Sequence, residues 1–261
     1  MGDSKQKFNG LSEDYDRFRP RYPEQLLQEI AKKVSVSAPN VVDAGAGTGI
    51  ELEGLRPLLG PAAQYRAVDI SADMVAIGRT KFPTVSWFVE PVEPFLERAT
   101  GVDLIVAAQS FQWMDRPRFL RAAASCLNGS GVIAIIQNNR HFTASPFLDA
   151  YESVLEEFSP RYRRRYRDFD FAGDLREHLS ELGATVEVAT VDWSTTLSTA
   201  EFVGMVKSST QAQRAITAHR QVFLDRVGAL LHEHAEGGKV AIPYHSELFT
   251  AQLPPSPESG A

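Results

Sequence analysis

The residues with the clearest chemical potential lie in the stretch 41–49, VVDAGAGTG, where two valines lead into an acid and then into glycine at every second position. Glycines at this density allow a tight turn at positive φ and leave backbone N–H groups open to a ligand. A strand, a glycine loop and a following helix place unpaired helix N–H groups at the carboxyl end of the strand, where open α/β sheets bind nucleotides. The stretch therefore predicts a nucleotide-type cofactor site.

The spacing of these glycines narrows the choice of cofactor. A dinucleotide fingerprint needs Gly-x-Gly-x-x-Gly, and its third glycine would fall at Ile50. A Walker phosphate loop would need a Gly-Lys-Ser/Thr ending, which does not follow here. An NAD-dependent oxidoreductase is therefore the weaker alternative.

The elements around the loop alternate between strand and helix patterns. Asp69 lies near the end of the second strand, Ser71 is a suitable N-cap for the next helix, and Asp115 with Pro117 starts a later one. The apolar runs that follow the first strand cover residues 65–70, 84–89, 102–107 and 132–136. Five strands alternating with helices predict a doubly wound, mostly parallel α/β sheet with helices on both faces.

Beyond residue 137 the alternation is less regular. Ser145-Pro146 starts a helix in the segment 140–171, which is rich in aromatic residues and in arginines from Arg161 to Arg167, and which we expect to form a helical lid. The remaining patterns predict a helix at 173–182, a strand at 185–193, a capping box at Ser198–Glu201, a long helix at 211–235 and an extended segment at 239–253. We expect residues 1–252 to form a single domain and residues 253–261 to be a disordered tail.

The composition limits the class of protein. A net charge of -6 and a pI of about 5.6 disfavour a general nucleic-acid or anionic-lipid surface. A single cysteine, Cys126, excludes a disulfide within the chain and fits a reducing compartment. Because no apolar run approaches the roughly 20 residues of a membrane span, we expect a soluble, cytoplasmic protein.

Several motifs together resemble a known family. The stretch 43–49, DAGAGTG, resembles motif I of class I S-adenosylmethionine-dependent methyltransferases, and Glu90-Pro91-Val92-Glu93-Pro94 is similar to the family's segment after the third strand. Residues 15–23, YDRFRPRYP, residues 108–115, AQSFQWMD, and the late Ile242-Pro243-Tyr244 resemble the trans-aconitate methyltransferase-like, or type 11, branch. The resemblance covers about residues 15–250. It implies a Rossmann-like, seven-stranded sheet whose last strand is antiparallel, with a helical lid inserted after strand five.

The resemblance also implies a cofactor, S-adenosylmethionine, with S-adenosylhomocysteine as the product. Residues 8–22 would cover the cofactor, with Tyr15 and Arg19 near its methionine carboxylate. Asp69 would bind the ribose hydroxyls, since a carboxylate offers two acceptor oxygens and no donor. Ile70 would contact the adenine, and backbone near Val92 would bind the adenine edge, although Pro91 replaces a polar residue that relatives often have. The full expected set is Tyr15, Arg19, Asp43, Ala44, Gly45, Gly47, Thr48, Asp69, Ile70, Met74, Val92, Glu93, Ala108 and Gln109.

The acceptor is less well specified. His141 and Asp115 are candidate general bases if the acceptor is a hydroxyl, whereas an amine could react through proximity alone. The residues expected to bind the acceptor are Tyr22, Phe111, Trp113, Arg140, His141, Phe142 and Tyr244. We expect no metal, since His232 and His234 alternate on a predicted helix and face different sides.

The hypothesis from the sequence is therefore O- or N-methylation of a planar or acidic small molecule, by a monomer or homodimer that binds neither nucleic acid nor membrane. An RNA methyltransferase that uses the arginine cluster, an NAD-dependent oxidoreductase and a non-catalytic cofactor-binding relative stay as alternatives.

Overall fold

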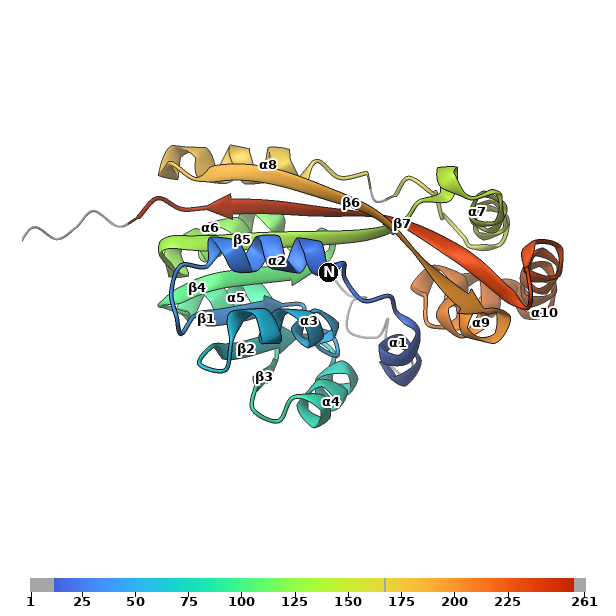
Figure 1. Cartoon of the computed structure of the whole chain (residues 1–261), viewed down its shortest axis with the longest axis horizontal. Helices are drawn as coiled ribbons and strands as arrows, with labels where there is room; N and C mark the ends of the chain where they lie inside the picture. The colour runs from blue at the N-terminus through green and yellow to red at the C-terminus, as the bar shows by residue number, and fades with distance from the viewer. Residues whose placement is uncertain (1–11, 167, 256–261) are drawn as a thin grey trace, which may run out of the picture.

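A computed structural model describes residues 12–166 and 168–255 of the chain. Its centre is one seven-stranded sheet in the order β3-β2-β1-β4-β5-β7-β6 (Figure 1). β7 pairs antiparallel with both β5 and β6, and the other neighbouring strands pair in parallel. The fold class predicted from the sequence is confirmed. The strands are β1 Asn40–Ala44, β2 Gln64–Asp69, β3 Ser86–Val89, β4 Val102–Ala108, β5 Leu127–Arg140, β6 Thr185–Ser198 and β7 Lys239–Gln252.

Helices cover both faces of the sheet because the central strands are apolar on both sides. In β4, Leu104 and Val106 pack into one core while Ile105 and Ala107 pack into the other. The first core is closed by α2 Glu24–Lys33, α3 Ile50–Leu59 and α4 Ala72–Lys81; the second is closed by α5 Val92–Arg98, α6 Arg116–Cys126 and α8 Phe171–Leu179.

A third hydrophobic core lies beyond the main sheet, around the outer halves of β6 and β7 (Figure 1). It is formed by α7 Pro146–Phe158, α9 Thr199–Lys207 and α10 Thr210–His234, together with side chains such as Ile242 and Tyr244 of β7. We call these three helices and the outer hairpin the cap. The predicted lid, residues 140–171, supplies only α7 of this layer; α9 and α10 belong to it as well.

The helix starts follow their capping residues. Ser71, Asp115, Ser145 and Ser198 each accept a backbone N–H from the first turn of their helix, and Ser198 forms the predicted capping box with Glu201. Short 3-10 turns lie at Phe111–Trp113, Phe142–Ala144 and Ser180–Leu182.

Two strands are much longer than the sequence predicted. β5 was expected to end at Ile136, yet it continues to Arg140, and β6 was expected to end at Trp193, yet it continues to Ser198. The extra part of β5 is the polar sequence Gln-Asn-Asn-Arg, which pairs with β7 from Tyr244 to Glu247. Such a polar strand carries no apolar alternation, so its signal lies in the distant partner strand and not in its own sequence.

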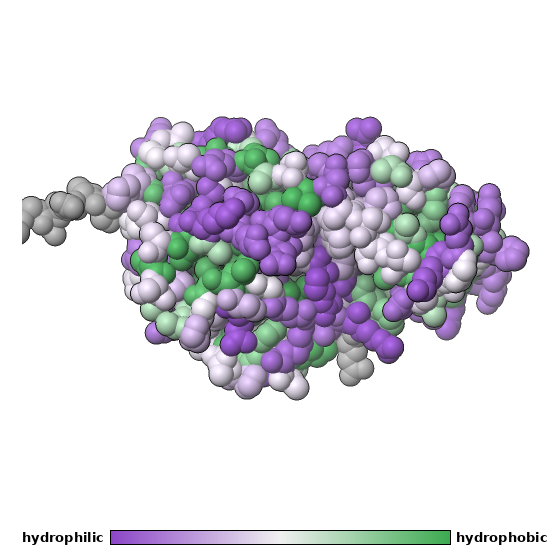
Figure 2. All heavy atoms as spheres, in the orientation of Figure 1, coloured by the Kyte–Doolittle hydropathy of each residue, from purple (hydrophilic) through white to green (hydrophobic). Residues whose placement is uncertain are grey.

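Within the part of the chain that the structure describes, no helix is both long enough and apolar enough to cross a membrane. Figure 2 shows one face of the molecule as mostly hydrophilic, with apolar areas scattered over both the main body and the cap. The segments 8–11 and 256–261, which the sequence assigned to a covering segment and a tail, lie outside the described residues.

Candidate cofactor and acceptor site

The glycine loop between β1 and α3 is held in a conformation that only glycine adopts easily. Gly45, Gly47 and Gly49 have φ values of 72°, 55° and 77°. The N–H groups of Gly45 and Ala46 donate to the Val68 carbonyl at 2.8 and 3.0 Å, which fixes the loop against β2. A Cβ atom on Gly45 would lie 2.5 Å from the Cβ of Ser110, so the loop after β4 packs directly on this glycine.

Asp69 lies beside the loop, at the end of β2. Its two carboxylate oxygens accept the N–H groups of Gly47 and Ser71, each at 2.8 Å. Burial raises the pKa of this carboxyl, and the backbone N–H bonds partly offset that effect. Each carboxylate oxygen can accept a further hydrogen bond, which suits a ligand with two neighbouring hydroxyls.

Hydrogen bonds and ion pairs hold the N-terminal helix α1, Ser12–Phe18, against the glycine loop. Thr48 Oγ1 donates to Asp16 at 2.7 Å, and Lys81 Nζ lies 2.5 Å from Asp16 and 2.7 Å from Glu53. Arg21 then binds Glu53 through two N–H groups, at 2.8 and 2.9 Å. These contacts place residues 12–21 over the loop, as a covering segment requires.

Tyr15 and Arg19 extend this cover. The Tyr15 ring lies 4.0 Å from where a Cβ on Gly47 would be, and the Arg19 guanidinium stacks on the Tyr15 ring at 4.8 Å. Arg19 also donates to the Ser208 carbonyl at 3.3 Å, while its Nε is buried with no hydrogen-bond partner among the described atoms. The two residues therefore lie together at the loop, and their contact with a cofactor carboxylate stays a prediction.

Beneath the loop, two carboxyl groups are buried against each other. Asp43 of β1 is 1% exposed and Glu51 of α3 is 3% exposed. Burial raises the pKa of Asp43 well above its usual value and the charge of Glu51 raises it further; burial also raises the pKa of Glu51. Glu51 is not among the site residues expected from the sequence, although its position on the inner face of an amphipathic helix could have indicated its burial. Tyr22, expected at the acceptor, instead faces this pair, and burial raises its pKa well above the usual value.

The other expected cofactor residues lie along the same strand ends. Ala44 accepts a hydrogen bond from Ser110 Oγ at 2.6 Å, and Ile70 directly follows Asp69. Of the other expected cofactor residues, Met74, Val92 and Ala108 are buried. Glu93 accepts a hydrogen bond from the backbone N–H of Asp115 at 2.9 Å.

Gln109 is strained, since it has a φ of 56° without being glycine. Its backbone N–H donates to the Ile136 carbonyl at 2.9 Å, which ties the end of β4 to β5, while its side-chain Nε2 is buried without a partner among the described atoms. Gln137, the next residue of β5, is 2% exposed, and neither polar atom of its amide has a partner there. Gln137 lies in the polar extension of β5, where no local pattern distinguishes it as a site residue. Strained residues and unpartnered buried amides concentrate at ligand sites, so Gln109 and Gln137 are candidate ligand contacts at the ends of β4 and β5.

Three residues expected to bind the acceptor, Phe111, Tyr244 and Arg140, are instead packed in a core or bound in an internal ion pair. Phe111 is fully buried between Phe119 and Phe171, in the core under α6 and α8. Tyr244 is buried in the core of the cap and stacks on Trp193 with ring centroids 4.8 Å apart. These placements argue against direct contact with an acceptor, and both aromatic residues are explained by packing.

The third is Arg140. Its guanidinium donates twice to Glu152 Oε1, at 2.7 and 3.0 Å, and Tyr162 donates to the other oxygen of Glu152. The cation is thus neutralised inside the protein and has a structural role in joining β5 to α7. Of the remaining expected acceptor residues, Trp113 is 48% exposed on the loop after β4, and Phe142 lies under the guanidinium of Arg164 at 5.6 Å.

The two candidate general bases, Asp115 and His141, lie in different surroundings. Asp115 is exposed and caps α6 by accepting the Arg118 N–H at 3.2 Å, a structural role that explains it fully. His141 directly follows β5, and its Nδ1 lies 3.8 Å from Asp192 Oδ1. His245, for which the extended segment predicts only a structural or surface place, binds the same carboxylate oxygen at 2.6 Å, and this hydrogen bond lowers the pKa of Asp192. At about 3.3 Å per strand residue, His141 lies roughly 16 Å along β5 from Ile136, so it could reach only an acceptor that extends along the strand.

The arginine cluster is partly neutralised. Arg164 binds Glu156 at 2.8 Å and Asp149 at 2.5 Å, while the exposed Arg165 lies 3.7 Å from Asp168. Among the residues placed by the structure, no group of three or more His, Cys, Asp or Glu side chains is arranged to hold a metal ion.

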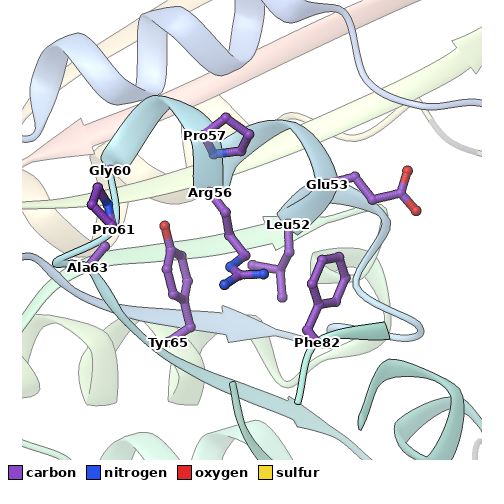
Figure 3. Close-up of a pocket in the computed structure, with 9 residues that line it drawn as sticks. All are labelled: Leu52, Glu53, Arg56, Pro57, Gly60, Pro61, Ala63, Tyr65 and Phe82. Atoms are coloured by element: carbon purple, nitrogen blue, oxygen red, sulfur yellow. The ribbon is translucent and has the colours of Figure 1, made fainter. Parts of the chain in front are cut away.

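A cavity of about 390 Å³ lies between α3 and the segments that carry Tyr65 and Phe82 (Figure 3). Arg56 projects into it between Tyr65 and Phe82, with its guanidinium 5.6 and 5.2 Å from the two ring centroids. Burial raises the pKa of Tyr65 to about 12. The cavity is open to solvent, and its lining includes Glu53, which also binds Lys81 and Arg21.

Comparison with known proteins agrees with the site. Residues 41–131 match the family described as methyltransferase domain. An uncharacterised methyltransferase of Mycobacterium tuberculosis is 26% identical over 242 residues, which are 92% of each chain. A protein from Anaeromyxobacter dehalogenans, described as a candidate type II methyltransferase, has the same fold with a TM-score of 0.68 at 19% identity, over 92% of this chain and all of that one.

A phosphoethanolamine N-methyltransferase from Haemonchus contortus, solved with phosphomonomethylethanolamine and S-adenosylhomocysteine, aligns with a TM-score of 0.55 at 15% identity, over 97% of this chain and 58% of that one. Over residues 41–131 the chain thus matches a methyltransferase domain, and over most of its length it is similar to proteins described as methyltransferases.

Proposed function

We propose that the chain transfers a methyl group from S-adenosylmethionine to a small-molecule acceptor bound between the main body and the cap. The observation that carries the proposal is the arrangement of the glycine loop. Positive-φ glycines, the Asp69 carboxylate and the covering helix α1 meet at the carboxyl ends of β1 and β2.

The donors and acceptors at this place fit the cofactor. Asp69 offers acceptor oxygens for the ribose hydroxyls. Gly47 leaves open space next to Tyr15, into which a Cβ atom would project. Arg19 carries a buried Nε–H without a partner, which suits the methionine carboxylate. We therefore assign these residues, with the backbone of residues 45–49, to cofactor binding.

The bound cofactor supplies an activated methyl group on a sulfonium, so the protein need only align an acceptor and exclude water. Helix α1 closes the glycine loop from solvent through the Asp16, Lys81 and Glu53 contacts. Gln109 and Gln137 orient a polar group of the acceptor at the ends of β4 and β5. If the acceptor is a hydroxyl that extends along β5, His141 or His245 takes its proton while Asp192 holds the imidazole.

A small acceptor fits the structure better than RNA. The chain carries a net charge of -6, and Arg164, the most buried arginine of the cluster with a placed side chain, is bound by two acids. The aromatic side chains of the predicted lid, such as Tyr151 and Phe147, are packed within the cap, so they give no reason to prefer a planar acceptor. The polar amides favour an acceptor with hydrogen-bonding groups.

Two measurements test the proposal. Isothermal titration with S-adenosylhomocysteine should show saturable binding, and no binding at high micromolar concentration would refute the assignment of the cofactor. Incubation of a metabolite panel with methyl-labelled S-adenosylmethionine, read by mass spectrometry, should show a labelled small molecule. Binding without any labelled product would support the non-catalytic alternative, whereas labelled RNA would support the RNA alternative. A spectral change with NADH would support the oxidoreductase alternative.

A further inference from the structure

Gln137 and Glu247 are neighbours on adjacent strands, and the function above uses only the first of them. The two residues are paired in the antiparallel register of β5 and β7. Paired residues place their side chains on the same face of a sheet, with Cβ atoms about 4.5 to 5.5 Å apart. Gln109 joins them from the end of β4, because its N–H donates to the carbonyl of Ile136, the residue before Gln137. The three residues therefore lie together at the ends of β4 and β5.

The two glutamines have hydrogen-bonding capacity that the protein itself does not use. Gln137 is 2% exposed, and among the described atoms neither polar atom of its amide has a partner. Nε2 of Gln109 is likewise buried without one. Unpartnered buried polar groups destabilise the folded state, and natural proteins keep few of them. A methionine at position 137 would pack as well, so the amide is better explained by a ligand that it binds.

The carboxylate of Glu247 lacks a counter-charge of its own. It is half-buried, and burial raises the pKa of this carboxyl. The two charged groups that act on it are His245, on the same face of β7, and Asp168, which adds negative charge. His245 is already bound to Asp192 at 2.6 Å, and Asp168 is 3.7 Å from the exposed Arg165. Within the described part of the chain, no lysine or arginine forms an ion pair with Glu247.

These groups define what a ligand must offer. It must donate hydrogen bonds to the Glu247 carboxylate and to the amide oxygen of Gln137, and it must bring positive charge to offset the carboxylate. An ammonium, amidinium or guanidinium group meets both needs. A carboxylate would be repelled by Glu247, and a neutral hydroxyl would leave its charge uncompensated.

We propose that the methyl acceptor carries a basic nitrogen group, an amine, amidine or guanidine, which forms an ion pair with Glu247 and donates a hydrogen bond to Gln137. The inference rests on the proposed function, since it takes the ends of β4 and β5 as the acceptor site. It makes Glu247 the residue that selects the acceptor by charge. It also replaces the acidic acceptor considered from the sequence with a basic one.

The test compares matched probes on protein saturated with S-adenosylhomocysteine. Benzamidine is paired with benzamide, and tryptamine with indolepropionate, so that each pair shares a ring system and differs in charge. Binding is measured by isothermal titration at millimolar probe concentrations. We expect the two basic probes to bind and their neutral and acidic counterparts not to bind.

Variants then assign the binding to named side chains. Glu247→Gln should weaken binding of the basic probes by about 10- to 100-fold, because an ion-paired hydrogen bond is lost. Gln137→Met should weaken it by about three- to tenfold, yet melt no lower than the wild type, since it removes an unpartnered buried amide. Glu187→Gln is the matched control, because Glu187 of β6 already has a cation, Lys33, at 2.8 Å. It should behave as the wild type.

The possible results separate this inference from the proposed function. Binding of S-adenosylhomocysteine is measured first, and its absence from the wild type would overturn the proposed function. With that binding intact, three results would overturn the inference alone: equal or tighter binding of benzamide and indolepropionate, unchanged affinity for the basic probes in Glu247→Gln, or no binding of either basic probe. In the metabolite panel, a labelled product without a basic nitrogen would contradict it as well.

Discussion

Replacing Asp69 should weaken cofactor binding strongly without removing the glycine loop itself. Its carboxylate already accepts two backbone N–H groups at 2.8 Å and has lone pairs left for the two ribose hydroxyls. A hydrogen bond to an ionised acceptor contributes about 1.5 to 3 kcal/mol, so Asp69→Ala loses roughly 3 to 6 kcal/mol of binding free energy. Burial raises the pKa of Asp69, which lowers the binding free energy that its ionised carboxylate contributes. We therefore expect a loss of binding free energy in the lower part of this range. At 1.4 kcal/mol per factor of ten, the dissociation constant should rise at least about 100-fold.

The assay is isothermal titration of S-adenosylhomocysteine into matched proteins. Asp69→Asn keeps one acceptor oxygen, so its loss of affinity should be smaller, on the order of tenfold. Asp73→Ala is the control, because Asp73 is an exposed acid in the first turn of the same helix α4 and should leave affinity unchanged. Thermal melts of all three variants separate a local loss from unfolding of the loop. Wild-type affinity in a folded Asp69→Ala would refute the reasoning, because the ribose would then be bound elsewhere.

Three further changes test other parts of the structure. Asp43→Asn should stabilise the free protein at pH 8 and have little effect at pH 4. Folding raises the pKa of the Asp43 carboxyl, so this group destabilises the folded state once the pH exceeds its pKa in the unfolded chain. Differential scanning calorimetry from pH 4 to pH 8 measures this difference in stability. Gly45→Ala should abolish cofactor binding and cost about 2 to 5 kcal/mol, the sum of backbone strain at φ 72° and overlap with Ser110, with urea unfolding as the measurement. Glu152→Ala should cost about 3 to 5 kcal/mol, since it leaves Arg140 buried without its anion, and equal stability of this variant and the wild type in urea would contradict the structural role of the pair.

The glycine loop and the acid beside it could be predicted from the sequence because their signals are local. The glycines of residues 45–49 need their positive φ values for steric reasons, and Asp69 with Ser71 marks the end of a strand and the start of a helix within three residues. Motifs of this kind depend on neighbouring residues and not on the rest of the fold. Glu51 shows the limit of such reasoning, since its burial against Asp43 depends on how α3 packs on β1.

The polar side chains at the outer ends of β5, β6 and β7 could not be predicted in the same way. Gln137 lies in a polar strand whose partner, Glu247, is 110 positions further along the chain, and Asp192 meets His245 only through pairing of β6 with β7. Aromatic residues were poor guides, because Phe111 and Tyr244 are equally well explained as core residues. An apolar side chain at a strand end packs in either case, so its type alone does not separate ligand contact from packing.

The attachment of α1 to the glycine loop has a consequence for the proposed cofactor. The ion pairs of Lys81 with Asp16 and Glu53 join α1 to α4 and α3, and their side chains are 21 to 29% exposed, so salt screens them in part. We expect a cofactor bound beneath α1 to enter and leave only when these pairs separate, so that turnover would include an opening step that depends on ionic strength. Where departure of the spent cofactor is the slowest event, moderate salt should raise the turnover rate, although it weakens a network that stabilises the closed form.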